Sequence, residues 1–433
     1  MNIANKHQMD NSHGHVGIDR IPQGWTVVQL GSYVDIFSGY AFKRQDFLSN
    51  KQNGVPIIKI GNLQNGQVSV DENTDYVTND FYDKLSDFQL RYGDVLIALS
   101  GATTGKIGVV SRDIGLVLVN QRVGKFKILN SEKITKKFFY YFAQSHKFRN
   151  FIIKNIGQSA QGNLSPLQIK NALIPLPSFP EQRKIAEILS TVDVAIEKVD
   201  KAIDKTERLK KGLMQELLTK GIGHKEFKDT EIGRIPKEWE VLNLGDIRIA
   251  EIRSSKRFNG FDKVVFIPME FISDSDILVR FEMRPIEKVK SYTYCESGDL
   301  LFAKITPSLE NGKQGIVPED IPNSFALATT EVIPIMCKGI DKFFLFYILK
   351  FNKYRNRIIA SMTGTTGRQR ASKESIERLQ IPLPTETEQQ KIVGILNSLN
   401  QQLLVYNQKR TSFTRIKKAL MNDLLTGNKR VKI

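Results

Sequence analysis

Apolar side chains recur in steps of four and three residues along two segments of this chain, each about forty residues long. In both segments eight of ten positions on that line are apolar, which is the spacing of a coiled-coil seam. Gly221 and Gly427 follow the two segments, where a C-terminal glycine stop is expected. The seam residues that we expect to pair the helices and support assembly are Ile185, Leu189, Val192, Ile196, Val199, Ile203, Leu396, Leu399, Leu403 and Leu424.

Both segments begin with a helix-start pattern, Ser178-x-x-Glu181 and Thr385-x-x-Glu388, directly after a Pro-Leu-Pro. We interpret these patterns as capping boxes. A helix over 181–220 would be about 60 Å long at about 1.5 Å per residue, and its seam must be buried against something. The most economical partner is the other copy, running antiparallel. The alternative is that each helix packs on its own neighbouring domain.

The chain is an internal repeat. Its two tryptophans, Trp25 and Trp239, stand 214 residues apart in matching Ile-Pro-x-x-Trp segments. Ile-Pro-Leu-Pro at 174–177 recurs at 381–384, a shift of 207 that holds for over forty residues. Between these blocks the halves agree only in fragments, such as Gly-Asp at 93–94 and at 298–299. The layout is therefore a variable head, a constant helix, a second variable head and a second constant helix.

The heads are predicted to be mixed α/β, because short apolar runs such as 55–60 and 94–99 alternate with polar, glycine-rich turns. Glycine lets backbone N–H groups approach phosphates, and Thr, Gln, Asn, Lys and Arg can contact phosphates and base edges. The alternative is that these are ordinary surface turns. The candidate DNA-binding residues are Ser100, Thr103, Thr104, Lys106, Gln121, Arg122, Gln158, Gln161, Asn163, Lys304, Thr306, Thr365, Thr366, Arg368, Gln369 and Arg370.

The formal net charge of +17 favours a polyanionic partner. Nucleic acid comes first, because the basic residues are spread along the chain rather than gathered in one amphipathic segment, as an anionic membrane surface would require. Basic residues between Lys350 and Arg378, with a weaker counterpart at Lys147, Arg149 and Lys154, suggest a phosphate-binding stripe.

No apolar run is long enough to span a bilayer, and the polar start lacks the apolar core of a secretory signal, so we expect a cytoplasmic protein. Cys295 and Cys337 have no metal or redox spacing and are expected to be reduced residues of the core or strands. His7, His13 and His15 could bind a metal, but we interpret them as polar residues of a flexible arm.

This combination of motifs resembles the specificity subunits of type I restriction-modification systems. The resemblance rests on Ile-Pro-Leu-Pro followed by Glu181-Gln182 and by Glu388-Gln389, on the Ile-Pro-x-x-Trp openings, and on Ser-Gly-Ala-Thr-Thr-Gly-Lys at 100–106. It covers about residues 18 to 427. Each motif alone is weak, and the set together is specific.

The resemblance implies a pseudo-two-fold repeat of two mixed α/β target-recognition domains, separated by two long antiparallel coiled-coil helices. Each domain would read one half of a bipartite, asymmetric DNA target. The helices would set the gap and dock two modification subunits, which supply S-adenosylmethionine chemistry; restriction subunits would add ATP- and Mg-dependent translocation and cleavage. The expected boundaries are an N-terminal arm at 1–17, head one at 18–178, the first helix at 179–222, head two at 223–384 with a short linker at its start, the second helix at 385–427 and a basic tail at 428–433.

We expect no catalysis and no cofactor in this chain. It contains no Pro-Pro, and so lacks the tetrad with which adenine methyltransferases hold a flipped base. The loop 101–106 is one residue short of a P-loop, and Ile107 stands where Ser or Thr would bind magnesium. Glu226-Phe-Lys228 has no Pro-Asp upstream to complete a nuclease site. The alternatives are a specificity subunit of a related, type II-like restriction-modification enzyme and a coiled-coil protein scaffold.

Overall fold

The computed structural model describes residues 21–49, 54–111, 114–156, 163–256, 260–365 and 367–433. The predicted N-terminal arm with its histidines lies outside these residues. The chain forms two compact units. Unit one is Met1–Val199 with Lys409–Ile433, and unit two is Asp200–Gln408. Each unit therefore holds one head, the beginning of one long helix and the end of the other.

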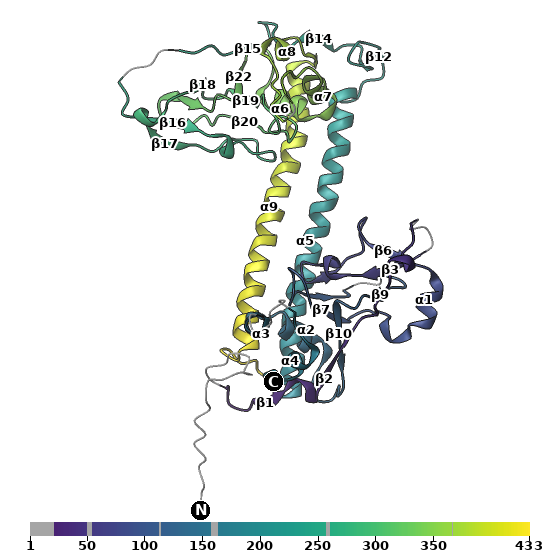
Figure 1. Cartoon of the computed structure of the whole chain (residues 1–433). Coiled ribbons are helices and arrows are strands. Elements are labelled where there is room, and N and C mark those ends of the chain that lie inside the picture. Colours follow the sequence, from purple (N-terminus) through teal and green to yellow (C-terminus); the bar gives the residue numbers. More distant parts are fainter. Residues whose placement is uncertain (1–20, 50–53, 112–113, 157–162, 257–259, 366) are drawn as a thin grey trace, which may run out of the picture. The chain divides into compact units, whose positions relative to one another are not determined.

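Head one in unit one is a mixed α/β domain (Figure 1). Its strands are β1 (Thr26–Gln29), β2 (Val34–Ser38), β3 (Val55–Ile58), β4 (Leu63–Gln64), β5 (Gln67–Val68), β6 (Asp75–Val77), β7 (Val95–Ala98), β8 (Ile107–Val109), β9 (Leu118–Val119), β10 (Val123–Ile128) and β11 (Leu173–Leu176). Its helices are α1 (Asn79–Lys84), α2 (Lys136–Ala143), α3 (His146–Ile156) and α4 (Pro166–Lys170).

Head two in unit two is built from a comparable set of elements. Its strands are β12 (Phe227–Lys228), β13 (Ile235–Pro236), β14 (Glu240–Asn243), β15 (Ala250–Ile252), β16 (Lys263–Ile267), β17 (Glu282–Pro285), β18 (Thr293–Glu296), β19 (Leu300–Ala303), β20 (Gln314–Ile316), β21 (Phe325–Ala328), β22 (Val332–Cys337) and β23 (Gln380–Leu383). Its helices are α6 (Lys342–Lys350), α7 (Asn352–Ala360) and α8 (Lys373–Glu377).

The strand orders show that the repeat extends through the part of the sequence where the heads differ. In head one the order β2-β10-β7-β8 leads a larger sheet, and in head two it is matched by β15-β22-β19-β20. A second sheet has a parallel pair in each head, β3 with β9 and β16 with β21. An early strand and the last strand close each head antiparallel, β1 with β11 in head one and β14, which follows the β12–β13 pair, with β23 in head two. The two heads thus share one topology on different sequences.

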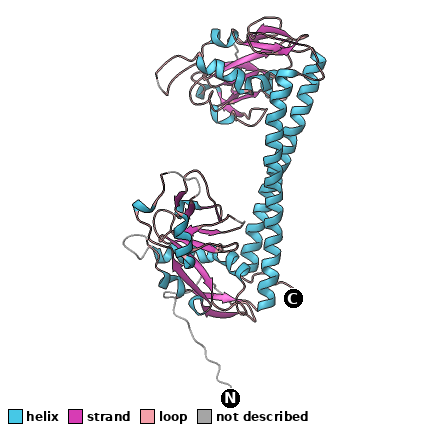
Figure 2. Cartoon of the chain, turned by 90° about the vertical axis from the view of Figure 1, so that its right-hand side faces the viewer, coloured by secondary structure: helices cyan, strands magenta, loops and turns pink. Residues whose placement is uncertain are grey.

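The long helices are α5 (Phe179–Lys220) and α9 (Glu386–Leu425). Unit one contains the beginning of α5 and the end of α9, and unit two contains the end of α5 and the beginning of α9. Within each unit the two helices lie side by side and run in opposite directions (Figures 1 and 2). Gly221 and Gly427 follow them with φ of 66° and 70°, the left-handed conformation of a glycine helix stop. The predicted antiparallel pairing is confirmed in each unit.

Each head packs on both helices in its unit, so the alternative that each helix packs only on its own head is incomplete. In unit one the core around Trp25 and Phe138 includes Ile185 and Leu189 of α5 and also Leu424 of α9. In unit two the core around Trp239 includes Leu217 and Leu218 of α5 as well as Ile392 and Leu396 of α9. The beginning of one helix and the end of the other are therefore parts of a single core.

The predicted seam residues of α5 and α9 are buried to different degrees. Ile185, Leu189, Ile203, Leu396, Leu399 and Leu424 are buried, and Val192, Ile196, Val199 and Leu403 are partly buried. Several apolar residues off the seam are exposed, as Val194 at 49%, Leu209 at 53% and Leu404 at 48% show, whereas Leu218 and Val393, also off the seam, are buried against a head. The predicted seam is therefore buried or partly buried throughout, and its role in assembly stays a prediction.

The helix starts differ from the predicted capping boxes. Thr385 does accept a hydrogen bond from the amide of Glu388 at 3.4 Å, which is half of a box. The carboxylate of Glu388, however, accepts a hydrogen bond from the indole N–H of Trp239 at 2.9 Å and does not turn back to the cap. Glu181 likewise accepts from the indole of Trp25, at 3.0 Å. Each glutamate therefore binds the tryptophan of its head instead of capping its own helix.

A third side chain, Arg430 or His224, completes each of these contacts, which we call the tryptophan clasps. In unit one the guanidinium of Arg430 donates to both oxygens of Glu181, at 2.5 and 2.8 Å. In unit two the Nε2 atom of His224 lies 2.9 Å from Oε1 of Glu388. Arg430 follows α9 at the place where His224 follows α5, three residues after Gly427 and Gly221 respectively. The clasps tie the end of one helix to the beginning of the other through a head residue.

The glutamines of the two Glu-Gln pairs hold a second connection to the heads. Gln182 donates to the carbonyls of Lys133 and Pro177 and accepts from the amide of Thr135 at 3.0 Å. Gln389 accepts from the amide of Asp341 at 2.8 Å and donates to the carbonyl of Pro384. Thr135 and Asp341 are the N-caps of α2 and α6, so each glutamine fixes a helix start in its head.

Cys295 is buried in β18 and Cys337 partly buried in β22, both as free thiols, as the sequence predicts. Across the described residues no helix is both long and apolar enough to cross a membrane.

Candidate nucleic-acid interface

Three candidate DNA contacts of head one meet just beyond the end of β7. The amide of Leu99 donates to the carbonyl of Arg122 at 2.9 Å, and the amide of Leu164 donates to the carbonyl of Leu99 at 2.9 Å. These bonds bring Ser100, Arg122 and Asn163 together from three separate segments. The side chains of Arg122 and Asn163 are exposed, as is that of Gln121.

The turn 101–106 presents some of its side chains and uses others to hold its shape. The amide and hydroxyl of Thr104 both donate to the carbonyl of Gly101, at 3.1 and 2.6 Å. Gly105 has a φ of 83°, and a Cβ there would lie 2.4 Å from the side chain of Ile152, so a larger residue would not fit. Thr103 and Lys106 are exposed. They remain the available contacts of this turn, whereas Thr104 is a structural residue of it.

The two predicted loops of head two also lie against each other. The amide of Thr306 donates to the carbonyl of Gln369 at 3.1 Å, and the amide of Ala371 donates to the carbonyl of Lys304 at 2.8 Å. The amide of Arg370 donates to the carbonyl of Thr363 at 2.8 Å, and the amide of Thr363 donates to the carbonyl of Arg370 at 3.0 Å, which closes the turn between these two residues. Lys304, Thr306, Gln369 and Arg370 therefore form one group.

The remaining candidates divide by position. Thr365 and Arg368 are exposed near the tip of the turn that Thr363 and Arg370 close. Gln158, Gln161 and Thr366 lie outside the described residues. The role of every candidate in DNA binding stays a prediction.

Some cations of the predicted basic stripe of Lys350 to Arg378 are engaged by backbone carbonyls, and the stripe as a phosphate-binding face stays a prediction. Arg355 is 6% exposed and donates to the carbonyl of Leu349 at 3.0 Å. Lys350 donates to the carbonyl of Gly312 at 3.0 Å, and burial lowers its pKa to about 8. Arg357 donates to the carbonyl of Glu231 at 2.7 Å. Arg355 and Lys350 satisfy backbone carbonyls in buried or partly buried positions, and the exposed Arg357 does so at the surface, a use that a count of charges along the sequence does not reveal.

A buried aspartate follows the matching glycine in both heads. In head one Asp94 accepts from the amide of Arg91 and pairs with Lys125 at 3.0 Å and Lys136 at 2.9 Å. Burial by itself would raise the pKa of the Asp94 carboxyl, but these hydrogen bonds and charges hold it below its usual value. The sequence signal was the shared Gly-Asp, whose partners were not predicted.

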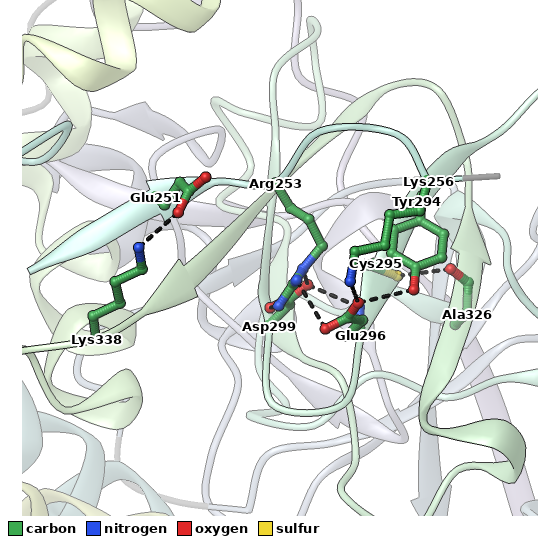
Figure 3. Close-up of polar contacts among 9 residues, drawn as sticks. All are labelled: Glu251, Arg253, Lys256, Tyr294, Cys295, Glu296, Asp299, Ala326 and Lys338. Carbon is green, nitrogen blue, oxygen red and sulfur yellow. Dashed lines mark hydrogen bonds and ion pairs between the residues drawn. The ribbon is translucent and has the colours of Figure 1, made fainter. Parts of the chain in front are cut away.

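In head two the matching Asp299 accepts from the amide of Glu296 and takes two hydrogen bonds from the guanidinium of Arg253 (Figure 3). Arg253 also reaches Glu296 at 2.8 Å, and Glu296 is held in turn by Lys256 and the hydroxyl of Tyr294. The network fixes the turn before β19, and β19 leads directly to Lys304.

The family model described as type I restriction modification DNA specificity domain matches the chain twice, at residues 22–207 and 236–412. The chain belongs to this family. Each match covers most of one head and the first part of the helix that follows it, which agrees with the repeat found in the sequence and in the strand order.

Individual specificity subunits are similar over almost their whole length. A protein of Methanocaldococcus jannaschii assigned as the MjaX type I restriction enzyme specificity subunit is 28% identical over 96% of this chain and 96% of its own length. The MjaVIII specificity subunit of the same organism is 26% identical over 95% of both chains. The crystal structure of the S subunit of a type I restriction-modification system from M. genitalium has a TM-score of 0.57 at 15% identity, covering 96% of this chain and 98% of that one, which supports the fold.

Within this specificity family, the Glu-Gln motif that carried the resemblance has a structural explanation in this chain. Glu181 and Glu388 hold the tryptophan clasps, and Gln182 and Gln389 fix the starts of α2 and α6. The motif thus joins heads to helices and lies apart from the loops that differ between heads. The described part of the specificity subunit has no cluster of His, Cys, Asp or Glu that could hold a metal ion.

Proposed function

We propose that this chain is the DNA-reading, non-catalytic subunit of a type I restriction-modification complex. Each head reads one half of a bipartite, asymmetric target in double-stranded DNA, and α5 and α9 set the unread gap. The observation that carries the proposal is that equivalent backbone hydrogen bonds in the two heads hold loops with different polar side chains. One scaffold with exchangeable loops is what reading two unlike half-sites requires.

Membership in the family supports the partners of this proposal. Two modification subunits dock on the long helices and bring S-adenosylmethionine, and restriction subunits bring ATP- and Mg-dependent translocation and cleavage. The absence of the methyltransferase tetrad, of a complete P-loop and of a nuclease metal motif from the sequence supports a subunit without catalysis of its own.

Binding of the full chain to a fluorescent pool of duplex DNA, measured by anisotropy at low and moderate salt, tests this function. We expect binding that weakens steeply with salt, because basic residues displace counterions from phosphates, and that still prefers a subset of sequences. A coiled-coil scaffold would show neither property. Incubation of the chain alone with labelled S-adenosylmethionine and DNA should give no methyl transfer, and labelled DNA would contradict the non-catalytic role.

A further inference from the structure

The two heads carry side chains of different charge at two equivalent positions beside the predicted DNA contacts. The amide of Lys304 donates to the carbonyl of Glu331 at 3.0 Å, just as Leu99 donates to Arg122 at 2.9 Å. Glu331 is thus the residue before β22 as Arg122 is the residue before β10.

A second pair of equivalent positions is defined by the backbone bonds that the residue after β19, and the residue after β7, accept from a neighbouring loop. The bond from Ala371 to Lys304 matches the bond from Leu164 to Leu99. Arg370, which precedes Ala371, therefore corresponds to Asn163, which precedes Leu164. Head one therefore has a cation, Arg122, before β10 and an amide, Asn163, in the facing loop. Head two has a carboxylate, Glu331, before β22 and a cation, Arg370, in the facing loop.

In head two these side chains form a pair. Nη2 of Arg370 donates to Oε1 of Glu331 at 2.9 Å. The side chain of Arg370 is 59% exposed and that of Glu331 is 27% exposed. Two hydrogen bonds to Thr363 fix the backbone of Arg370, and the bond to Glu331 orients its guanidinium, which still faces solvent.

This arrangement suits a base edge better than a phosphate. A guanidinium has five N–H donors, and one contact to Glu331 leaves enough of them for the two acceptors O6 and N7 of guanine. The carboxylate beside it repels a phosphate and cancels the net charge that would release counterions. An orientation fixed in advance reduces the entropy lost on binding, which favours specific recognition.

We propose that Arg370, oriented by Glu331, reads a guanine in the half-site of head two. Glu331 is a positioning residue, and it was not among the candidates found from the sequence. The inference rests on the proposed function, since it names the base class that one head selects. The competing role is purely structural, in which the pair only joins the turn at 363–370 to the residue that precedes β22.

The experiment measures relative binding of the full chain to a pool of duplexes in which every base pair of the selected target is replaced in turn. In Arg370→Ala, discrimination at one G·C pair of one half-site should fall by about 10- to 100-fold, while all other positions keep their wild-type preference. Arg370→Lys should not restore it, because an ammonium does not present the planar fork. Glu331→Ala should weaken the same position, and Glu331→Gln should largely restore it, because the amide oxygen can still accept from Nη2.

Arg248→Ala is the matched control. Arg248 also pairs with a carboxylate in head two, Asp246, at 2.7 Å, and the two side chains are 63% and 24% exposed. It should leave discrimination unchanged at every position.

Two results would overturn the inference. Uniform loss of affinity in Arg370→Ala with a shallower salt dependence would make Arg370 a phosphate contact. Unchanged discrimination with a lower melting temperature would mean that the pair only stabilises the fold of head two. A wild-type chain that shows no sequence preference would instead refute the proposed function itself, so the two failures are distinguishable.

Discussion

Unit one and unit two have the same frame but stabilise it with different side chains. Tyr141 in unit one donates to Asp193, which also pairs with Lys417 at 2.6 Å. In unit two Tyr347 donates to Asn397, and Asn400, which stands where the repeat places Asp193, donates to the tyrosine oxygen. Lys210, the counterpart of Lys417, has an asparagine in place of Asp193, and burial lowers its pKa although the charge of Glu207 opposes the shift.

The clasps and buried aspartates differ in the same way. Arg430 in one clasp is replaced by His224 in the other, and the two lysines around Asp94 are replaced by a single arginine, Arg253, on Asp299. The tryptophans, the Glu-Gln pairs, the Gly-Asp turns and the strand order are kept. The buried residues that fix the backbone are thus the same in both units. The residues that pair with their charged groups differ and come from different helices, strands or loops.

The largest effect is expected from charge in the helix seam. Leu396→Asp with Leu403→Asp places a carboxylate at a site that is fully buried in the core of unit two. We expect a loss of about 4 kcal/mol in the stability of unit two, together with failure to assemble with modification subunits. Hydrogen exchange read by mass spectrometry would show the loss in unit two. Leu404→Asp, at a residue that is 48% exposed, should change little, and an equal effect there would argue against the seam.

The two Glu-Gln pairs predict an intermediate effect that differs between the units. Gln182→Ala removes three hydrogen bonds and Gln389→Ala removes two, all at buried side chains. At about 1 kcal/mol each, we expect losses of about 3 and about 2 kcal/mol, each in its own unit. Urea unfolding followed by hydrogen exchange measures both. A larger loss for Gln389→Ala would mean that the glutamines do not act through these bonds.

The smallest effect is a gain. Asn400→Asp should recreate beside Lys210 the pair that Asp193 makes with Lys417, and stabilise unit two by about 1 kcal/mol. A double-mutant cycle with Lys210→Met isolates the interaction, since the gain should vanish when the lysine is absent. A gain that survives in the double variant would show that the repeat register does not place these residues together.

The elements that depend on local sequence could be predicted. Periodic apolar residues and glycine stops are local signals, and they located α5, α9 and strands such as β3 and β7. The clasps could not be predicted, because Glu181 meets Trp25 and Arg430 across 156 and 249 residues. For the same reason a charge count placed buried Arg355 in a stripe and gave no sign that Glu331 holds Arg370. Composition suggested which loops could bind DNA, and only the fold shows which of their side chains face one another.

The central claim is that each head reads its own half of the target. The pairing of β14 with β23, at 240–243 and 380–383, closes head two at the ends of residues 246–380, which include only Gln380 of this strand pair. This segment can therefore be exchanged for that of another specificity subunit while the strand pair is kept. The chimera would be assembled with modification subunits, and the methylated adenines in genomic DNA would be mapped. We predict that one half of the methylated target changes while the other half stays the same. A change in both halves, or in neither, would contradict the account.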